Sequence, residues 1–326
     1  MHAKRRGNSR AAVQGASATT TNKKPSLHRK RQRRGIHRRD YARYRDFLRR
    51  GLVSFYTKLS RLVDETPQPY TVRDPHTRGN PPANPRDIVR FLLVRAFEGW
   101  SYDHVYAVLG AYTGLPGILG FTRVPHPNTV LGNQDRIPER YWEDLIQRLS
   151  VRLNKVFPGP INAAGDATGE GTRQFQRWYD VRFGKIGKRE QYLKLHALVA
   201  TRARWPWFLA ARVTRGNIND CTELGALLEQ LDGGIMLGNL ALDKGYQSRR
   251  NAELVEARGG RPVMDLRKNS RRRADGSPAW RRMVRLRQDD GRVFRCLYRR
   301  RTIVKGVFGA FKRRFGDRVK SRREHR

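Results

Sequence analysis

The spacing of hydrophobic residues divides the chain into a helical part and a part with strands. In the first part, large apolar side chains recur every three or four residues, which is typical of amphipathic helices. This spacing predicts a helix that covers residues 41–55, and further helices that begin at Pro85, Ser101 and Pro138. Residues 124–130 predict a turn into a short helix capped by Asn128. Residues 40–156 are therefore expected to form a small all-α region.

From residue 158 onward, short apolar runs separated by turns replace the helical pattern. Five runs have the length and composition of strands, at residues 161–164, 193–200, 207–214, 240–243 and 262–266. A helix is predicted after the third run, with Asp220 and Glu223 as a capping box, and another at residues 248–258. A basic insertion near residues 268–296, centred on Trp280, leads to a final long helix.

The order β-β-β-α-β-α-β-α is that of an RNase H-like fold. The predicted class is therefore α/β, with a mixed sheet flanked by helices at residues 157–326. The small all-α domain precedes it.

Charge is the strongest global signal. The 326 residues include 69 Lys and Arg against 29 Asp and Glu, a net charge of +40. Such a balance indicates a polyanionic partner, because each cation that contacts a phosphate releases condensed counterions. DNA, RNA and an anionic lipid surface all fit the charge alone. For residues 40–156, a DNA-binding or dimerisation region is expected, with a plain helical bundle as the alternative.

The N-terminal segment is the most basic part of the chain. Residues 23–50 contain 13 Lys and Arg but only two acids, Asp40 and Asp46. Residues 1–39 lack large apolar groups and are predicted to be a disordered basic tail that orders on a polyanion. A tail that only aids solubility is the alternative. Six prolines between residues 65 and 86 predict a linker.

Several classes of protein are disfavoured by what the sequence lacks. No apolar run approaches the ~20 residues that span a bilayer, and the N-terminus lacks the apolar core of a signal peptide. Cys221 and Cys296 are the two cysteines, too few for a disulfide framework or a four-cysteine zinc site. A soluble cytoplasmic protein associated with the nucleoid, without a membrane partner, is expected.

Two aspartates follow predicted strands. Asp166 ends the first and Asp243 ends the fourth, and glycines shortly after both leave room for a phosphate. Phosphodiester chemistry uses divalent ions held by carboxylates around the scissile phosphate. Taken singly, each aspartate also fits a turn former. Together, in this order of elements and with this charge, they predict a metal-binding catalytic pair.

The final helix carries a cationic face. Tyr298, Arg301, Lys305 and Lys312 are spaced i, i+3, i+7 and i+14, which places them on one side of a helix. An apolar stripe adjoins them, made of Val304, Val307, Phe308, Phe311 and Phe315. This arrangement predicts a helix docked on the sheet with its cations along a phosphate backbone. An ordinary amphipathic helix with a solvated basic face fits the same spacing.

These residues resemble a family. The block Tyr298-x2-Arg301-x3-Lys305-x6-Lys312 is similar to Tyr-x2-Arg-x3-Glu-x6-Lys of the insertion-sequence DDE transposases, in the insertion-sequence-4 group. Residues 165–169 with 177–179, residues 194–196 with 212–216, and residues 243–246 look like its other blocks. The resemblance covers residues 158–321 well and residues 85–150 weakly.

The resemblance implies specific roles. Asp166 and Asp243 would be catalytic and hold Mg²⁺ or Mn²⁺ in a two-ion site. Tyr298, Arg301, Lys305 and Lys312 would bind DNA. The partner would be double-stranded DNA, both terminal inverted repeats and target DNA, with a homodimer in the DNA complex.

One departure from the family pattern concerns the third acid. Its position is taken by Lys305, so a cation replaces a metal ligand. Residues 291–316 contain no Asp or Glu, and Asp317 lies 12 residues on, about 18 Å along a helix. The family's chains also usually continue past this helix. We therefore expect a decayed and truncated copy with an impaired, weakened metal site.

Other interpretations of Lys305 stay open. In one interpretation, Asp220, Asp265 or an acid from a partner completes the site. In the others, the metal is held in a different arrangement, or the sequence contains an error at this position. A catalytically inactive DNA-binding relic is the first rival function. A basic RNA-binding protein is the second, although it predicts neither the paired aspartates nor the final block.

Overall fold

The computed structural model describes residues 41–73, 81–171, 192–201, 206–267, 270, 276–317 and 319. Contacts divide the chain into two units, residues 1–48 and 49–326. The predicted tail at residues 1–39, the family-like block at residues 177–179 and part of the basic insertion lie outside the described residues. Within the described residues, no helix is long and apolar enough to cross a membrane.

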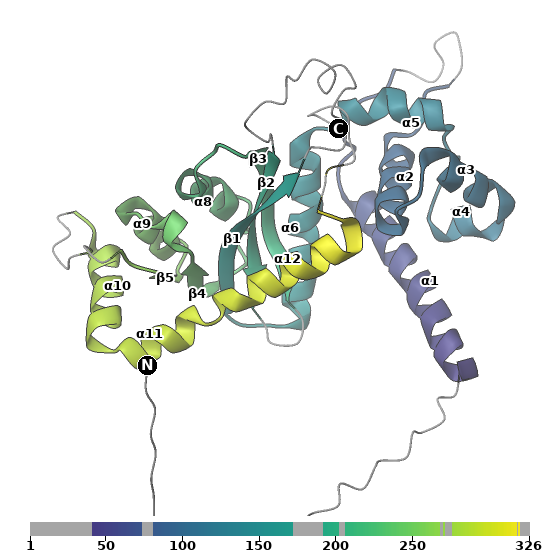
Figure 1. The fold of residues 1–326 in the computed structure, drawn as a ribbon. Coiled ribbons are helices and arrows are strands. Elements are labelled where there is room, and N and C mark those ends of the chain that lie inside the picture. Colours follow the sequence, from purple (N-terminus) through teal and green to yellow (C-terminus); the bar gives the residue numbers. More distant parts are fainter. Residues whose placement is uncertain are drawn as a thin grey trace, which may run out of the picture. The chain divides into compact units, whose positions relative to one another are not determined.

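The first part of the chain is helical, as predicted (Figure 1). Its helices are α1 (Tyr41–Glu65), α2 (Pro85–Glu98), α3 (Tyr102–Ala111), α4 (Gly114–Ile118), α5 (Pro127–Asn133) and α6 (Glu139–Val156), with a 3₁₀ turn, η1 (Gln134–Arg136), before α6. Ser101 caps α3 by accepting the N–H of His104. The predicted Asn128 cap is wrong. Its N–H instead donates to the His126 ring, because Pro127 already takes the first position of α5.

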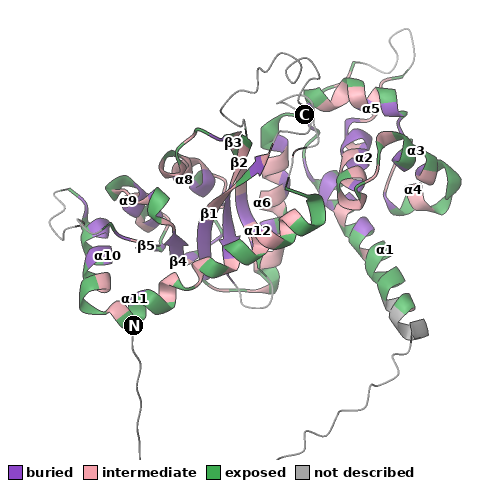
Figure 2. Cartoon of the chain, in the orientation of Figure 1, coloured by how far each residue is buried: buried purple, intermediate pink, exposed green. Residues whose placement is uncertain are grey.

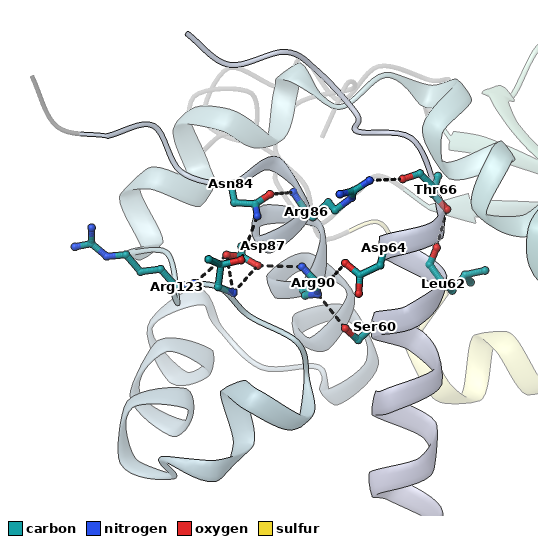
Figure 3. A network of polar contacts seen from close by, with 10 residues as sticks. Ser60, Leu62, Asp64, Thr66, Asn84, Arg86, Asp87, Arg90 and Arg123 are labelled. Carbon is teal, nitrogen blue, oxygen red and sulfur yellow. Dashed lines mark hydrogen bonds and ion pairs between the residues drawn. The ribbon is translucent and has the colours of Figure 1, made fainter. Parts of the chain in front are cut away.

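A cluster of polar contacts built on the buried Asp87 and Arg90 connects these helices (Figure 3). Asp87 accepts hydrogen bonds from the backbone N–H groups of Thr122 and Arg123 and from Arg90. The Arg90 guanidinium also contacts Ser60 and Asp64 of α1. Burial raises the pKa of Asp87, against these hydrogen bonds and the Arg90 charge. The cluster therefore ties α1, α2 and the segment after α4 together.

The second part contains a five-stranded mixed sheet of order β3-β2-β1-β4-β5. The strands are β1 (Ile161–Gly171), β2 (Tyr192–Ala200), β3 (Trp207–Arg215), β4 (Leu237–Leu242) and β5 (Arg261–Met264). β1 runs antiparallel to β2 and parallel to β4. The helices that follow are α8 (Asp220–Glu229), α9 (Arg249–Ala257), α10 (Pro278–Asp289), α11 (Gly291–Tyr298) and α12 (Arg301–Phe315). Through β5 this is the order of elements predicted from the sequence, and three helices follow where one long final helix was predicted.

Both faces of the sheet are covered, and Figure 2 shows its central strands as buried. One face packs against α8, α9 and α10 to form the larger core. Trp280, from the predicted basic insertion, is buried in this core. On the other face, Val304 and Phe308 of α12 pack against small residues of the strands. Gly165 is required where β1 crosses the larger core. A Cβ there would lie 2.6 Å from the Leu242 side chain.

Three predicted details are wrong. Asp166 does not end its strand, because pairing with β2 extends β1 to Gly171. The cap of α8 is Asn219, whose side chain accepts the N–H of Cys221, so Asp220 lies inside the helix rather than at its cap. The final helix is divided: α11 ends at Tyr298 and α12 begins at Arg301. At this break the backbone N–H of Thr302 donates to the carbonyl of Arg299, three residues earlier in the chain. The hydroxyl of Thr302 donates to the same carbonyl oxygen.

Candidate active site

The two predicted aspartates lie side by side at the centre of the sheet. β1 and β4 are parallel neighbours, and Gly165 is registered with Leu242. The residues that follow are Asp166 in β1 and Asp243 at the end of β4. The parallel pairing ends at this register, so Asp166 and Asp243 both follow the last paired residues of β1 and β4. Long-range pairing therefore brings together two acids that are 77 residues apart in the sequence.

A guanidinium group joins these two carboxylates. Nη1 of Arg301 donates to Oδ1 of Asp243 at 2.6 Å, and Nη2 lies 3.6 Å from Oδ2 of Asp166. Nη1 also donates to the hydroxyl of Tyr298 at 2.9 Å. Tyr298 therefore reaches the site from the end of α11, although it does not share a helix with Arg301.

The environment of Asp166 is partly apolar. Burial raises the pKa of its carboxyl, and the charge of Asp243 acts in the same direction. The N–H of Ala167, which donates to Oδ1 at 3.0 Å, and the charges of Arg301 and Lys305 oppose this rise. Lys305 is exposed. It lies in α12 between Val304 and Phe308 in the sequence, and these two residues pack the helix against the sheet. Its charge therefore acts at the edge of the acid pair.

Lys312 belongs to a different part of the sheet. Its Nζ donates to the carbonyl of Gly169 at 2.6 Å and lies 3.4 Å from the Glu170 carboxylate. The chain after α12 stays beside β1, since the N–H of Gly171 donates to the carbonyl of Asp317. Sequence reasoning missed Glu170, whose pKa is raised by burial. Its place four residues after Asp166 in an extended strand was the available signal.

The acids proposed as substitutes for the third ligand have other partners. Asp220 accepts a hydrogen bond from Lys194 at 2.9 Å, and its carboxylate lies 3.6 Å from His196. Asp265 pairs with Arg287 at 2.8 Å. Across the described residues, no group of three or more His, Cys, Asp and Glu is arranged to hold a metal ion. Among the residues that the structure describes, neither acid therefore completes a three-carboxylate set.

His196 is a buried residue on the opposite face of the sheet from α12. Its side chain is fully buried, and its Nε2 lies 2.8 Å from the Thr214 hydroxyl. Burial lowers the pKa of the imidazole. This residue therefore packs inside the domain rather than facing the acid pair.

The turn that follows Asp243 is held by buried residues that the sequence analysis did not identify. A 3₁₀ turn, η3 (Lys244–Tyr246), follows Asp243, and Tyr246 is fully buried. Nδ2 of the buried Asn251 donates to the carbonyls of Tyr246 at 2.8 Å and Cys221 at 3.0 Å. This amide connects the turn to α8 and α9, so it holds the backbone next to Asp243.

The donor set supports one metal ion. Mg²⁺ commonly uses one or two protein carboxylates, with water and substrate phosphate completing its shell. Asp166 and Asp243 supply two carboxylates on rigid backbone, and both already contact the cationic Arg301. The described residues thus fit a single divalent ion, while a second ion lacks its carboxylate.

Comparison with known proteins bears on residues 164–326. A family model for the transposase DDE domain matches this range, half of the chain, and the range includes every residue of the acid pair and of α12. A search of curated proteins and a search of solved structures returned no significant match.

Proposed function

The chain belongs to the DDE transposase family, and on this basis we propose that it acts on double-stranded DNA at the acid pair of Asp166 and Asp243. The observation that carries the proposal is the contact of Arg301 with both carboxylates, one within β1 and the other directly after its parallel neighbour β4. The spacing from Tyr298 to Lys312 supports a place in the insertion-sequence-4 group. The +40 charge supports a nucleic acid partner.

Each residue has a role in this proposal. Asp166 and Asp243 would hold Mg²⁺ or Mn²⁺, and the ion would supply Lewis-acid activation of the phosphate and of the attacking oxygen. Arg301 and Lys312 would bind phosphates of the strand, and Tyr298 would position it next to Arg301. Lys305 would weaken the site, because it places a cation where the family pattern has an acid.

The wider setting follows from the same family. Terminal inverted repeats and target DNA would be the ligands, with a homodimer in the complex and a nucleoid location. A catalytically inactive DNA-binding copy is the second candidate function, favoured by Lys305 and by the two-carboxylate donor set. A basic RNA-binding protein accounts for the charge but not for the paired aspartates.

Metal binding tests the proposed site directly. Titration of the full chain with Mn²⁺ in a calorimeter is expected to show weak binding that depends on both aspartates. Asp166→Ala or Asp243→Asn should lower the affinity by more than about tenfold, the least that loss of an outer-shell partner costs in metal sites. Asp103→Asn, an exposed acid on α3, is the control and should change nothing. Equal affinity in the wild type and Asp166→Ala would remove Asp166 from the site.

Salt dependence tests the contribution of the N-terminal tail. Thirteen of the first 40 residues are Lys or Arg. Deletion of residues 1–40 leaves α1 intact and should reduce the slope of log K against log salt by about 0.9 for each phosphate that the tail neutralises. Binding of a labelled duplex is measured from low to high salt with and without the tail. The same slope in both proteins would show that the tail does not bind DNA.

A further inference from the structure

One guanidinium group faces both proposed ligands of the active site. Nη1 and Nη2 of Arg301 contact the carboxylates of Asp243 and Asp166, at 2.6 and 3.6 Å. The Arg301 side chain is only 15% exposed, and the Tyr298 hydroxyl accepts a further bond from Nη1. Its Nε is buried without a partner among the described residues. The planar fork of an arginine suits such a bridge, whereas a lysine offers a single point charge.

This bridge occupies one oxygen atom of each carboxylate that would bind a metal ion. Oδ1 of Asp243 accepts the short bond from Arg301, and Asp166 faces the other end of the same group. A divalent ion that bound both carboxylates would meet a fixed cation at contact distance, and like charges at that distance repel strongly in a partly buried site. Metal entry therefore requires the guanidinium to leave at least Asp243.

The same bridge also occupies the group that would bind a phosphate. Arginine donates its N–H groups to carboxylate and phosphate in the same bidentate manner. While Arg301 is paired with Asp243 and Asp166, its donors on that side are directed at protein oxygens. A DNA phosphate would therefore have to displace the acids from Arg301, just as a metal would have to displace Arg301 from the acids.

We propose that Arg301 is the resident counter-ion of the acid pair and couples the metal site to the phosphate site. The inference rests on the proposed function, since it takes Asp166 and Asp243 as the metal ligands. The metal binds the carboxylates of this ion pair, and the DNA phosphate binds its guanidinium, so either ligand breaks the pair. When both are bound, the pair is broken only once, so each ligand strengthens the binding of the other by the same factor.

The proposal fixes the sign of a measurable effect. Without DNA, Arg301 competes with the metal, so its removal raises metal affinity. If Arg301 only held the carboxylates in position for the metal, its removal would lower that affinity. The two roles therefore predict opposite changes in the DNA-free protein.

Three variants distinguish competition between Arg301 and the metal from a general effect of positive charge near the site. Arg301→Gln removes both the bridge and the charge, while Arg301→Lys keeps the charge but cannot bridge two carboxylates. Arg299→Gln removes an equal charge from an exposed residue two positions away and serves as the matched control. Circular dichroism of each full-length variant checks that the fold is retained.

Mn²⁺ titration of the DNA-free proteins gives the first result. Arg301→Gln is expected to bind Mn²⁺ about tenfold more tightly than the wild type, within the range of coupled sites. Arg301→Lys should show a smaller increase, and it decides the question if Arg301→Gln does not fold. Arg299→Gln should stay close to the wild type, because an exposed charge is screened by salt.

Binding of a labelled duplex, in EDTA and in Mn²⁺, gives the second result. Mn²⁺ should strengthen DNA binding in the wild type and do so less in Arg301→Gln. Unchanged or weaker Mn²⁺ binding in both Arg301 variants would overturn the counter-ion role, provided that Asp243→Asn abolishes Mn²⁺ binding. Unaltered Mn²⁺ binding in Asp243→Asn would instead overturn the proposed metal site, and this inference with it.

Discussion

The unmodified chain is expected to nick supercoiled DNA in Mn²⁺ on the order of a thousandfold more slowly than its Lys305→Glu variant. The substitution changes the local charge by two units beside Asp166, whose pKa already responds to Lys305. Metal stabilisation of a phosphoryl transition state is worth several kcal/mol. At about 1.36 kcal/mol per factor of ten, loss of that stabilisation accounts for a rate difference of this size.

The structure indicates that this substitution leaves the fold intact. Lys305 is exposed, whereas its neighbours Val304 and Phe308 carry the contact between α12 and the sheet. The end of the helix is held separately, because the chain after it bonds to Gly171 of β1. A glutamate at this position would therefore add a carboxylate at the edge of the acid pair without disturbing the docked helix.

Two controls separate a metal ligand from a change in charge. Lys305→Gln removes the cation but adds no carboxylate, and it should recover only part of the rate. Arg313→Glu makes the same change in charge at an exposed position eight residues further along α12, and it should have little effect. Strong nicking by the unmodified protein, abolished in Asp243→Ala, would show that the site works without the third acid.

The sequence predicted those parts of the fold that depend on local pattern. The strand runs and the helices between them predicted the order of these elements along the chain, and Asp243 directly follows its strand, close to the expected position. The short apolar run at residues 161–164 predicts a strand that ends at Asp166. Pairing with β2 overrides that local preference, since β1 continues in register from Ala163 to Gly171.

The parts that escaped prediction depend on tertiary contacts. Helical spacing placed Tyr298 and Arg301 on one face but did not show the break between them. It also did not show that Arg301 faces Asp166 and Asp243, because that ion pair exists only once α12 is docked on the sheet. The cationic face was expected to meet solvent and DNA. In the structure, Arg301 contacts two acids of the protein, and Lys312 contacts a carbonyl and an acid.

Stability of the helical part depends on the buried pair of Asp87 and Arg90. The Asp87 side chain is 1% exposed, and it accepts the N–H groups of Thr122 and Arg123 in addition to the bond from Arg90. Asp64 binds the same guanidinium, but its side chain is 52% exposed. The two aspartates therefore share one arginine but differ in burial and in the two backbone N–H groups that only Asp87 is seen to accept.

Asp87→Ala is expected to lower the free energy of unfolding by about 3–5 kcal/mol, the usual cost of leaving one member of a buried ion pair alone. The variant also leaves two backbone N–H groups without their acceptor, each of which adds to the loss. Asp64→Ala should cost about 1 kcal/mol or less, because water screens and replaces an exposed partner. Urea titrations of both full-length variants, followed by circular dichroism, measure the difference. Similar losses in the two proteins would mean that Arg90 does not depend on Asp87 and that the buried cluster does not hold α1 to α2.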